Sequence, residues 1–300
     1  MVITQIIGGL GNQMFQYALG RNLSQKLKCE LKIDTRPFSW YKLHKYSLHH
    51  FAIPQEVASE QEIKKVRYGT TRPAVILGID LVNKFSKKIL KRELLPLKNL
   101  FTDTGEAFKA EVLRHRGDVM LEGYWQSEKY FSECRDLLVN DFAVVTAPSD
   151  NNKRLLDRIG ACNSVSIHIR RGDYVSNPET QKIHGVCSVA YYEKAVETIR
   201  RRVKNPNFFI FSDDAEWAEA NLKIPDSTIV KGNDADHNYE DLRLIYSCRH
   251  NIIANSSFSW WGAWLNQNSE KIVIAPAIWA ASSVIETKDI VPESWERLCA

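Results

Sequence analysis

The second half of the chain alternates short apolar segments with amphipathic ones, and this alternation restricts the fold more than any other feature. Strands are predicted at 164–169, 208–211, 228–230, 251–254 and 271–275, and helices at 188–204, 239–247 and 257–266. Strands that alternate with helices form mainly parallel sheets with right-handed crossovers. The sequence therefore predicts a Rossmann-like arrangement of the α/β class for this half.

The first half begins in the same way. A strand at 2–7, a glycine turn at 8–11 and a helix at 12–28 precede a second strand at 31–34. Residues 35–70 show no clear period, so they predict loops or short helices. The polar segment 147–152 is typical of a domain boundary. We therefore expect one domain at 1–150 and a second at 151–300.

Composition sets limits on the class of protein. With 44% hydrophobic and 25% charged residues the chain is globular, and its net charge of +4 is too small to require a nucleic-acid partner. The six cysteines form no CxxC pair, which predicts reduced thiols and a cytoplasmic location. The N-terminus is typical of a strand and not of a signal peptide, and we expect no transmembrane segment.

Two adjacent arginines follow the strand at 164–169, in the segment His168-Ile169-Arg170-Arg171-Gly172-Asp173. A guanidinium matches phosphate oxygens with two parallel hydrogen bonds, and ligands of open α/β sheets lie beyond the carboxyl ends of the strands. The segment therefore predicts a phosphate bound by Arg170. A surface salt bridge at a strand end is the alternative.

Two further strands end in polar residues. Asp213 and Asp214 follow the strand at 208–211, where a carboxylate can accept hydrogen bonds from a ribose or a guanine edge or can cap a helix. The segment 255–262 follows another strand and opens a helix, so Ser256 and Ser257 are candidates for a phosphate cradle. Phe258 is a candidate to stack on a base, whereas Trp260, Trp261 and Trp264 are expected in the core.

The glycine turn Gly8-Gly9-Leu10-Gly11 lies between a strand and a helix. Its glycines, Gly11 among them, allow close approach of the backbone, and Asn12 and Gln13 add amides at the helix start. The turn is not a phosphate-binding GxxxxGK[ST] loop, and the third glycine of a GxGxxG motif is replaced by Met14. A tight turn that only packs helix on strand is the alternative.

Asp234 and Asp236 have DxD spacing but no evident third ligand, so we predict no metal site.

Four segments together resemble the α-1,2-fucosyltransferases of glycosyltransferase family 11: GGLGNQMFQYALGRNL, HIRRGDY, FSDD and YEDLRLIYSCRHNIIANSSFSWWGAWLN. The resemblance implies a GT-B-like fold, in which two Rossmann-type domains face each other across a cleft. It also implies a GDP-fucose donor, inversion at the anomeric carbon, no cofactor and no obligatory metal. The implied acceptor is a galactose-terminated oligosaccharide.

The resemblance also implies roles for single residues. Arg170 would contact the donor pyrophosphate, and His168 and Asp214 would lie near the guanosine. Ser256, Ser257 and Phe258 would line the phosphate and base pocket, with Asn12 and Gln13 facing them across the cleft. Asp173 is our first candidate for the base that deprotonates the acceptor, and orienting Arg170 is its alternative role. A glutamate that some relatives carry five residues later is Pro178 here, so that assignment does not transfer.

Other functions stay open at this point. A fucosyltransferase of different linkage and a non-catalytic sugar-nucleotide or glycan-binding protein would both fit much of the pattern.

The segment 80–97 is basic and amphipathic, with its cations at Lys84, Lys87, Lys88, Lys91 and Arg92. It predicts either a solvated surface helix or a peripheral contact with the inner membrane face, where a lipid-linked acceptor would lie.

Overall fold

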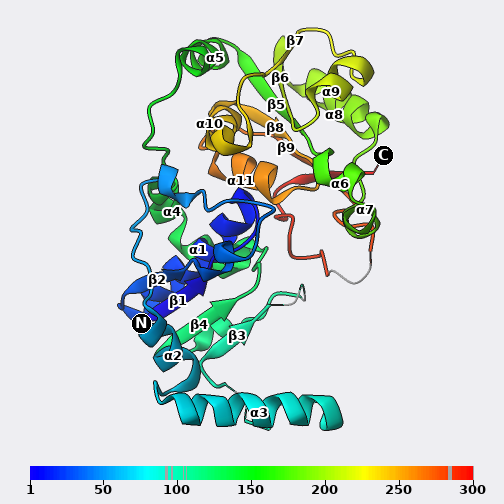
Figure 1. Ribbon diagram of the computed structural model, residues 1–300. Coiled ribbons are helices and arrows are strands. Elements are labelled where there is room, and N and C mark those ends of the chain that lie inside the picture. The colour runs from blue at the N-terminus through cyan, green and yellow to red at the C-terminus, as the bar shows by residue number, and fades with distance from the viewer. Residues whose placement is uncertain (92–93, 96, 104, 106, 283–285, 300) are drawn as a thin grey trace.

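The computed structural model describes residues 1–300 except 92–93, 96, 104, 106, 283–285 and 300, and describes Leu90 and Asp173 by their backbone only. Two parallel sheets organise it (Figure 1). The first has the order β2-β1-β4-β3, with β1 at Val2–Gln5, β2 at Leu31–Asp34, β3 at Leu100–Thr102 and β4 at Val119–Glu122. The helices of this half are α1 (Leu10–Leu27), α2 (Glu60–Tyr68), α3 (Pro73–Leu90) and α4 (Arg135–Asp141).

The second sheet has six strands in the order β10-β9-β8-β5-β6-β7. Its strands are β5 (Asn163–Ile169), β6 (Pro206–Ser212), β7 (Ser227–Ile229), β8 (His250–Ile252), β9 (Val273–Pro276) and β10 (Glu296–Leu298). Its helices are α5 (Asp150–Gly160), α6 (Gly172–Ser176), α7 (Pro178–His184), α8 (Val189–Arg202), α9 (Ala215–Asn221), α10 (Asn238–Ser247) and α11 (Ser257–Leu265). The chain moves outward from β5 in one direction through β6 and β7, then returns to the other side of β5 at β8. This reversal makes the β5/β8 boundary the place where a doubly wound sheet binds its ligand.

The alternation along β6 explains why helices cover both faces of this sheet. Phe208 and Ile210 belong to the apolar cluster of α8 and α9, whereas Phe209 and Phe211 belong to that of α5 and α10. Successive side chains of a strand point to opposite faces, so an uninterrupted apolar run fits a sheet buried on both sides.

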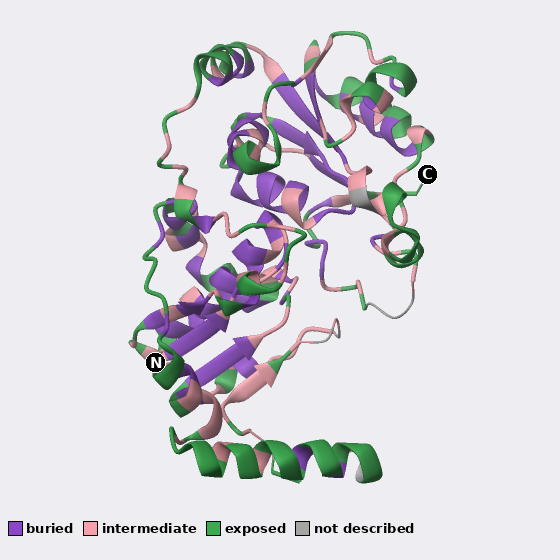
Figure 2. Cartoon of the chain, in the orientation of Figure 1, coloured by how far each residue is buried: buried purple, intermediate pink, exposed green. Residues whose placement is uncertain are grey.

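Helix α11 joins the two halves. Trp260 and Trp261 are fully buried and pack on Phe15 of α1 at ring-centroid distances of 4.5 and 5.1 Å. The cluster continues to Phe131 and Phe142, so the largest apolar core contains residues of both halves (Figure 2). The expectation that these tryptophans are core residues is confirmed.

The expected strands and helices of the second half are present, with ends shifted by a few residues. Residues 35–70 contain the short 3-10 helices Arg36–Ser39 and Leu48–His50 besides α2. The other 3-10 helices are Val112–Arg114, Glu128–Tyr130, Ser132–Cys134 and Ala235–His237. The prediction for 80–97 was wrong in its bounds, because a single helix, α3, begins at Pro73 and includes the apolar run before Asp80. Among the described residues, no helix combines the length and apolarity needed to cross a bilayer.

Candidate donor-binding site

The pairing of β5 with β6 brings the predicted polar segments together. Ile169 pairs with Ser212 in register, so Arg170 and Asp213 leave adjacent strands at the same edge. On the other side of β5, Ile167 pairs with Ile252, which places residues 253–258 at this edge as well. The residues after β5, β6 and β8 therefore form one site at the β5/β8 boundary.

Both arginines at this edge pair with aspartates. Arg170 Nη1 lies 3.0 Å from Asp213 Oδ2, and the backbone N–H of Arg171 donates to Asp213 Oδ1 at 2.8 Å. Arg171 Nε donates to Asp214 at 3.2 Å, and its guanidinium lies 3.9 Å from the ring centroid of Trp217. The expected alternative, a salt bridge at the strand end, is thus present, and it fixes the direction of both guanidinium groups.

Of the two aspartates, Asp214 caps the following helix. Its Oδ1 accepts from the backbone N–H of Trp217 at 3.1 Å, at the start of α9. With one oxygen on the helix and the other on Arg171, the carboxylate is held by protein groups. Its expected position near the guanosine stays a prediction.

His168 is buried, with 6% of its surface exposed, beneath the site. Among the described residues its Nδ1 has no hydrogen-bond partner, and its ring lies 5.4 Å from that of Phe258. Burial, and then the charge of Arg170, lowers the pKa of His168 to about 3. A neutral imidazole with an unpaired nitrogen is suited to a hydrogen bond with a bound ligand, because an unmade bond is costly in a buried place.

The glycine turn reaches the start of α11. A methyl group on Gly11 would come within 2.4–2.6 Å of backbone atoms of Ser257 and Phe258, so only glycine fits. Ser256 is the N-cap of α11, with no side-chain capping bond, and is 5% exposed. Two helices, α1 and α11, thus begin close together, and each supplies backbone N–H groups of the kind that bind anions.

Asn12 and Gln13 have different surroundings. Asn12 is half-buried, and its Oδ1 accepts from Gln126 Nε2 at 2.7 Å. Gln13 is fully buried: its Nε2 donates to the carbonyls of Gly8 and Lys45, and its Oε1 accepts from the N–H of Ser47. These bonds hold the segment 45–47 against the glycine turn, and the expected place of Gln13 at the donor stays a prediction.

The side chain of Asp173 lies outside the described part of the chain. Its backbone belongs to α6. The next residue, Tyr174, is one that the sequence did not single out. Tyr174 lies over Arg170, 5.3 Å from its guanidinium carbon, and its hydroxyl donates to Asn255 O at 3.4 Å. Asn255 in turn donates to the carbonyls of His184 and Trp279. Adjacency to the arginine motif was the only sequence signal for Tyr174.

The DxD pair has structural partners. Asp234 accepts from the His237 ring at 2.7 Å and from the backbone N–H groups of Asp236 and His237, while Asp236 pairs with Lys45 at 2.7 Å. Within the described ranges no three metal-ligating side chains of His, Cys, Asp or Glu gather in one place.

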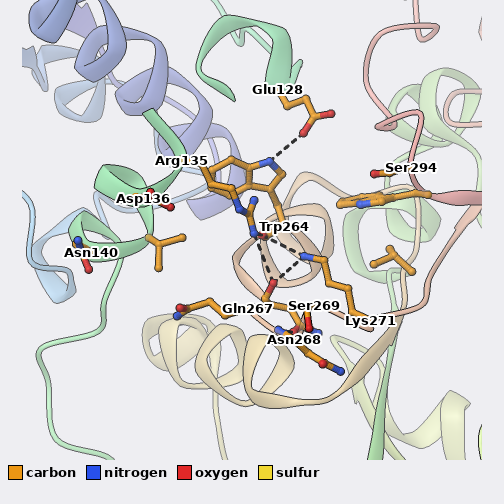
Figure 3. A pocket seen from close by; sticks show the side chains of 14 residues that line it. Glu128, Arg135, Asp136, Asn140, Trp264, Gln267, Asn268, Ser269, Lys271 and Ser294 are labelled. Carbon is orange, nitrogen blue, oxygen red and sulfur yellow. Dashed lines mark hydrogen bonds between the residues drawn. The ribbon is translucent and has the colours of Figure 1, made fainter. Parts of the chain in front are cut away.

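A cavity of about 630 Å³ lies elsewhere, at the far end of α11 (Figure 3). Two cations that line it donate to carbonyls at the C-terminal end of the helix. Lys271 Nζ donates to the carbonyls of Ala263 and Asn266, and Arg135 donates to Trp264 O at 2.6 Å. Burial, and then the charge of Arg135, lowers the pKa of Lys271 to about 8. These groups cap the negative end of α11, so the cavity is not part of the site at the strand ends.

The fold defines a class of protein with a GT-B-like arrangement, in which two sheets of Rossmann type carry polar residues at the strand ends of the second. The chain matches the family described as glycosyl transferase family 11 over residues 1–298 and belongs to that family.

Two relatives are similar along nearly the whole chain, and a third along about half of it. An Escherichia coli protein named alpha-1,2-colitosyltransferase is 37% identical over 305 residues, covering 99% of each chain. The O-antigen biosynthesis glycosyltransferase WbnK of Escherichia coli is 31% identical and covers 97% of this chain and 98% of its own. The galactoside alpha-(1,2)-fucosyltransferase 1 of Ateles belzebuth is 26% identical over 48% of this chain and 42% of its own.

Solved structures share the fold at low identity. NodZ alpha-1,6-fucosyltransferase soaked with GDP-fucose has a TM-score of 0.50 at 14% identity, covering 88% of this chain and 91% of its own. A mutant of Arabidopsis thaliana FUT1 in complex with GDP has a TM-score of 0.51 at 9% identity, covering 98% and 75%. These likenesses establish the arrangement of the two sheets.

Proposed function

We propose that this glycosyltransferase transfers L-fucose from GDP-β-L-fucose to the 2-hydroxyl of a terminal galactoside, with inversion, to give an α-1,2 linkage. The observation that carries the proposal is the convergence of Arg170, the start of α11 and the Nδ1 of His168, which no described residue pairs, at the β5/β8 boundary. A nucleoside diphosphate needs the same set: cations and N–H groups for its phosphates, and polar groups for its base.

The roles follow from charge development in the reaction. Departure of GDP places negative charge on the β-phosphate while the sugar becomes oxocarbenium-like. Arg170 stabilises that charge, with the N–H groups at the start of α11 and Ser256 and Ser257 beside it. These groups replace the charge of a metal ion. His168 and Asp214 lie next to the guanosine, and Phe258 covers the base.

The acceptor hydroxyl must lose its proton. We keep Asp173 as the candidate base, with orientation of Arg170 as its alternative role. Asp173→Asn separates the two. Loss of a base lowers kcat by roughly 10²–10⁴-fold with GDP affinity unchanged, whereas loss of an orienting group weakens GDP binding.

We propose the domain at 151–300 as the donor side and the domain at 1–150 as the acceptor side. Gly11 and Asn12 belong to the latter and face the donor phosphates across the cleft. The contact of Gly11 with Ser257 and Phe258 supports this arrangement.

The name of the relative at 37% identity gives a second candidate for the donor sugar, nucleotide-activated colitose. Colitose lacks the 3-hydroxyl of fucose. A site that hydrogen-bonds this hydroxyl rejects the deoxy sugar by orders of magnitude, whereas an apolar site discriminates weakly. The two donors therefore belong in one experiment.

That experiment incubates the protein with each donor and a panel of β-galactosides, and records GDP release and product linkage. Transfer of fucose to the 2-hydroxyl supports the proposal. Preference for the colitosyl donor reassigns the sugar, and a different linkage reassigns the reaction. Binding of GDP-fucose with neither transfer nor hydrolysis would identify a non-catalytic binding protein.

We further propose that the acceptor is lipid-linked and that the cytoplasmic protein binds the inner membrane face through α3 and the segment 80–97. One face of α3 carries large exposed apolar side chains: Leu77 at 60%, Leu81 at 57%, Phe85 at 68% and Ile89 at 59%. A second face is anchored, since Asn83 exchanges two hydrogen bonds with the backbone of Leu95. Figure 1 shows α3 at the edge of the molecule, away from the second sheet.

The charges beside this apolar face favour an anionic bilayer over a second copy of the chain. Lys84 and Lys88 follow Leu81 by three and seven positions, so they lie along one border of the face. Each lysine contributes about 1 kcal/mol near an anionic surface. Arg92 lies outside the described residues.

Co-sedimentation with phosphatidylglycerol and phosphatidylcholine vesicles tests this contact. We expect salt-sensitive binding to the anionic vesicles alone, lost when Lys84, Lys87, Lys88 and Lys91 become Gln. The matched control changes four exposed lysines elsewhere to Gln: Lys153, Lys194, Lys204 and Lys223. Equal loss in both variants, or a concentration-dependent dimer without vesicle binding, would contradict the proposal.

A further inference from the structure

The loops after β1 and β4 lie side by side at the carboxyl edge of the first sheet. Thr4 pairs with Leu121 in the parallel register, so residues 6–9 and 123–126 leave this sheet together. Gln16, buried within α1, connects them: its Oε1 accepts from Ile7 N–H at 2.9 Å and its Nε2 donates to Gly123 O at 3.0 Å. One side chain thus fixes the spacing of both loops.

The loop after β4 holds an uncommon backbone. Trp125 has a φ of 55° although it is not glycine, and Gly123 has a φ of 129°. The Trp125 ring is fully buried, and the backbone N–H of Trp125 donates to Asp103 Oδ2 at 2.8 Å. A strained conformation persists only where its surroundings determine it, and such residues concentrate at functional sites.

The effect of this turn is to leave Tyr124 at the surface while its neighbour is buried. Tyr124 is 41% exposed, and its Cε1 would lie 3.4 Å from a methyl group on Gly8. The His44 ring would lie 3.5 Å from a methyl group on Gly9. Two rings therefore flank a pair of residues that have no side chains.

This surface is adjacent to the donor site. Gly11, in the same turn, contacts the backbone of Ser257 and Phe258, and Gln126 donates to Asn12. The carboxyl edges of both sheets thus meet at the glycine turn. When the donor is bound at the edge of the second sheet, the edge of the first sheet is available to the molecule that receives the sugar.

We infer that Tyr124, Gly8, Gly9 and His44 form the acceptor subsite, which takes a neutral pyranoside with its apolar face on the Tyr124 ring. The inference rests on the proposed function for the nature of the acceptor. A tyrosine ring offers a large, rigid, amphipathic surface at low entropic cost, which suits a sugar that presents C–H groups on one face and hydroxyls at its rim. Gln16 is a positioning residue for this subsite.

Direct binding of lactose and methyl β-galactoside in the presence of GDP tests the inference, by saturation-transfer NMR and titration. Tyr124→Ala should weaken binding of both sugars roughly tenfold or more, since it removes the apolar contact. Tyr124→Phe should retain it. The GDP dissociation constant should stay unchanged in both variants. Tyr68→Ala, which truncates a tyrosine on α2, is the matched control and should bind the sugars as the wild type does.

Two results would overturn the inference: unchanged sugar binding in a folded Tyr124→Ala protein, or equal weakening of sugar and GDP. Absence of sugar binding by the wild type would overturn it as well. The readout is independent of turnover. A wild type that binds lactose through Tyr124 but does not use GDP-fucose would support the subsite and contradict the proposed donor.

Discussion

Arg170 and Asp213 lie 3.0 Å apart at the ends of adjacent parallel strands, and Asp213 also accepts from the N–H of Arg171. The carboxylate thus joins the backbone after β5 to the side chain that we assign to the pyrophosphate. Gly172 completes the arrangement, because a methyl group there would come within 2.6 Å of Asp213 Oδ2. A guanidinium held in one direction loses less entropy on binding an anion.

Arg170→Lys should nearly abolish transfer while the fold is retained. Lysine keeps the charge but cannot make two parallel hydrogen bonds to the pyrophosphate. We expect a loss of about 3 kcal/mol of transition-state stabilisation, or roughly 10²–10³-fold in kcat. Steady-state kinetics with a circular-dichroism control measure it, and near-normal kcat in the folded variant would remove Arg170 from the phosphate site.

Gly11→Ala should destabilise the junction of the two halves. The added methyl group meets backbone atoms of Ser257 and Phe258, which cannot move as a flexible side chain could. We expect a loss of about 1–3 kcal/mol in the free energy of unfolding together with weaker GDP binding. Gly78→Ala is the matched control, because a methyl group there meets nothing within 4 Å. Equal stability of the two variants would contradict the packing argument.

His168 should make the stability of the protein depend on pH. Burial lowers its folded-state pKa to about 3, below the unfolded value of about 6.5. Between these values only the unfolded chain binds the proton, so the contribution of His168 is lost as pH falls below about 6.5.

His168→Gln removes this contribution. As pH falls from about 6 to about 4, the unfolding free energy of the wild type should decrease relative to that of the variant, by up to about 1.4 kcal/mol per pH unit. Urea denaturation across this range measures the difference. A difference that does not change with pH would show that His168 is protonated or exposed in the folded protein.

Activity should survive excess EDTA. Arg170 and the helix starts supply positive charge at the departing phosphate, while Asp234 and Asp236 are paired with His237 and Lys45. Assays of transfer with EDTA, then with added Mn²⁺ or Mg²⁺, test this. Restoration by metal after a loss would assign the DxD pair to the donor, and Asp236→Asn would then lower activity.

The sequence by itself determined the order of strands and helices and the polar residues at the strand ends. Apolar runs such as 208–211 must be buried on both faces, and a charged residue such as Arg170 directly after a buried strand must lie at its edge. These conclusions need only local periodicity. The family resemblance carried by the motifs is confirmed by a family match over residues 1–298.

Only the tertiary structure decided which residues meet. The pairing of Arg170 with Asp213 depends on strand order, and the contact of Gly11 with α11 joins opposite ends of the chain. Gln13 and Gln16 are three positions apart on one helix, yet the first holds the segment 45–47 and the second holds the loop after β4. The sequence period of α3 predicts an apolar face, but only the structure shows that this face is exposed. The local sequence pattern specifies how much of a segment is buried. The packing of distant segments specifies which other residues the buried side chains contact.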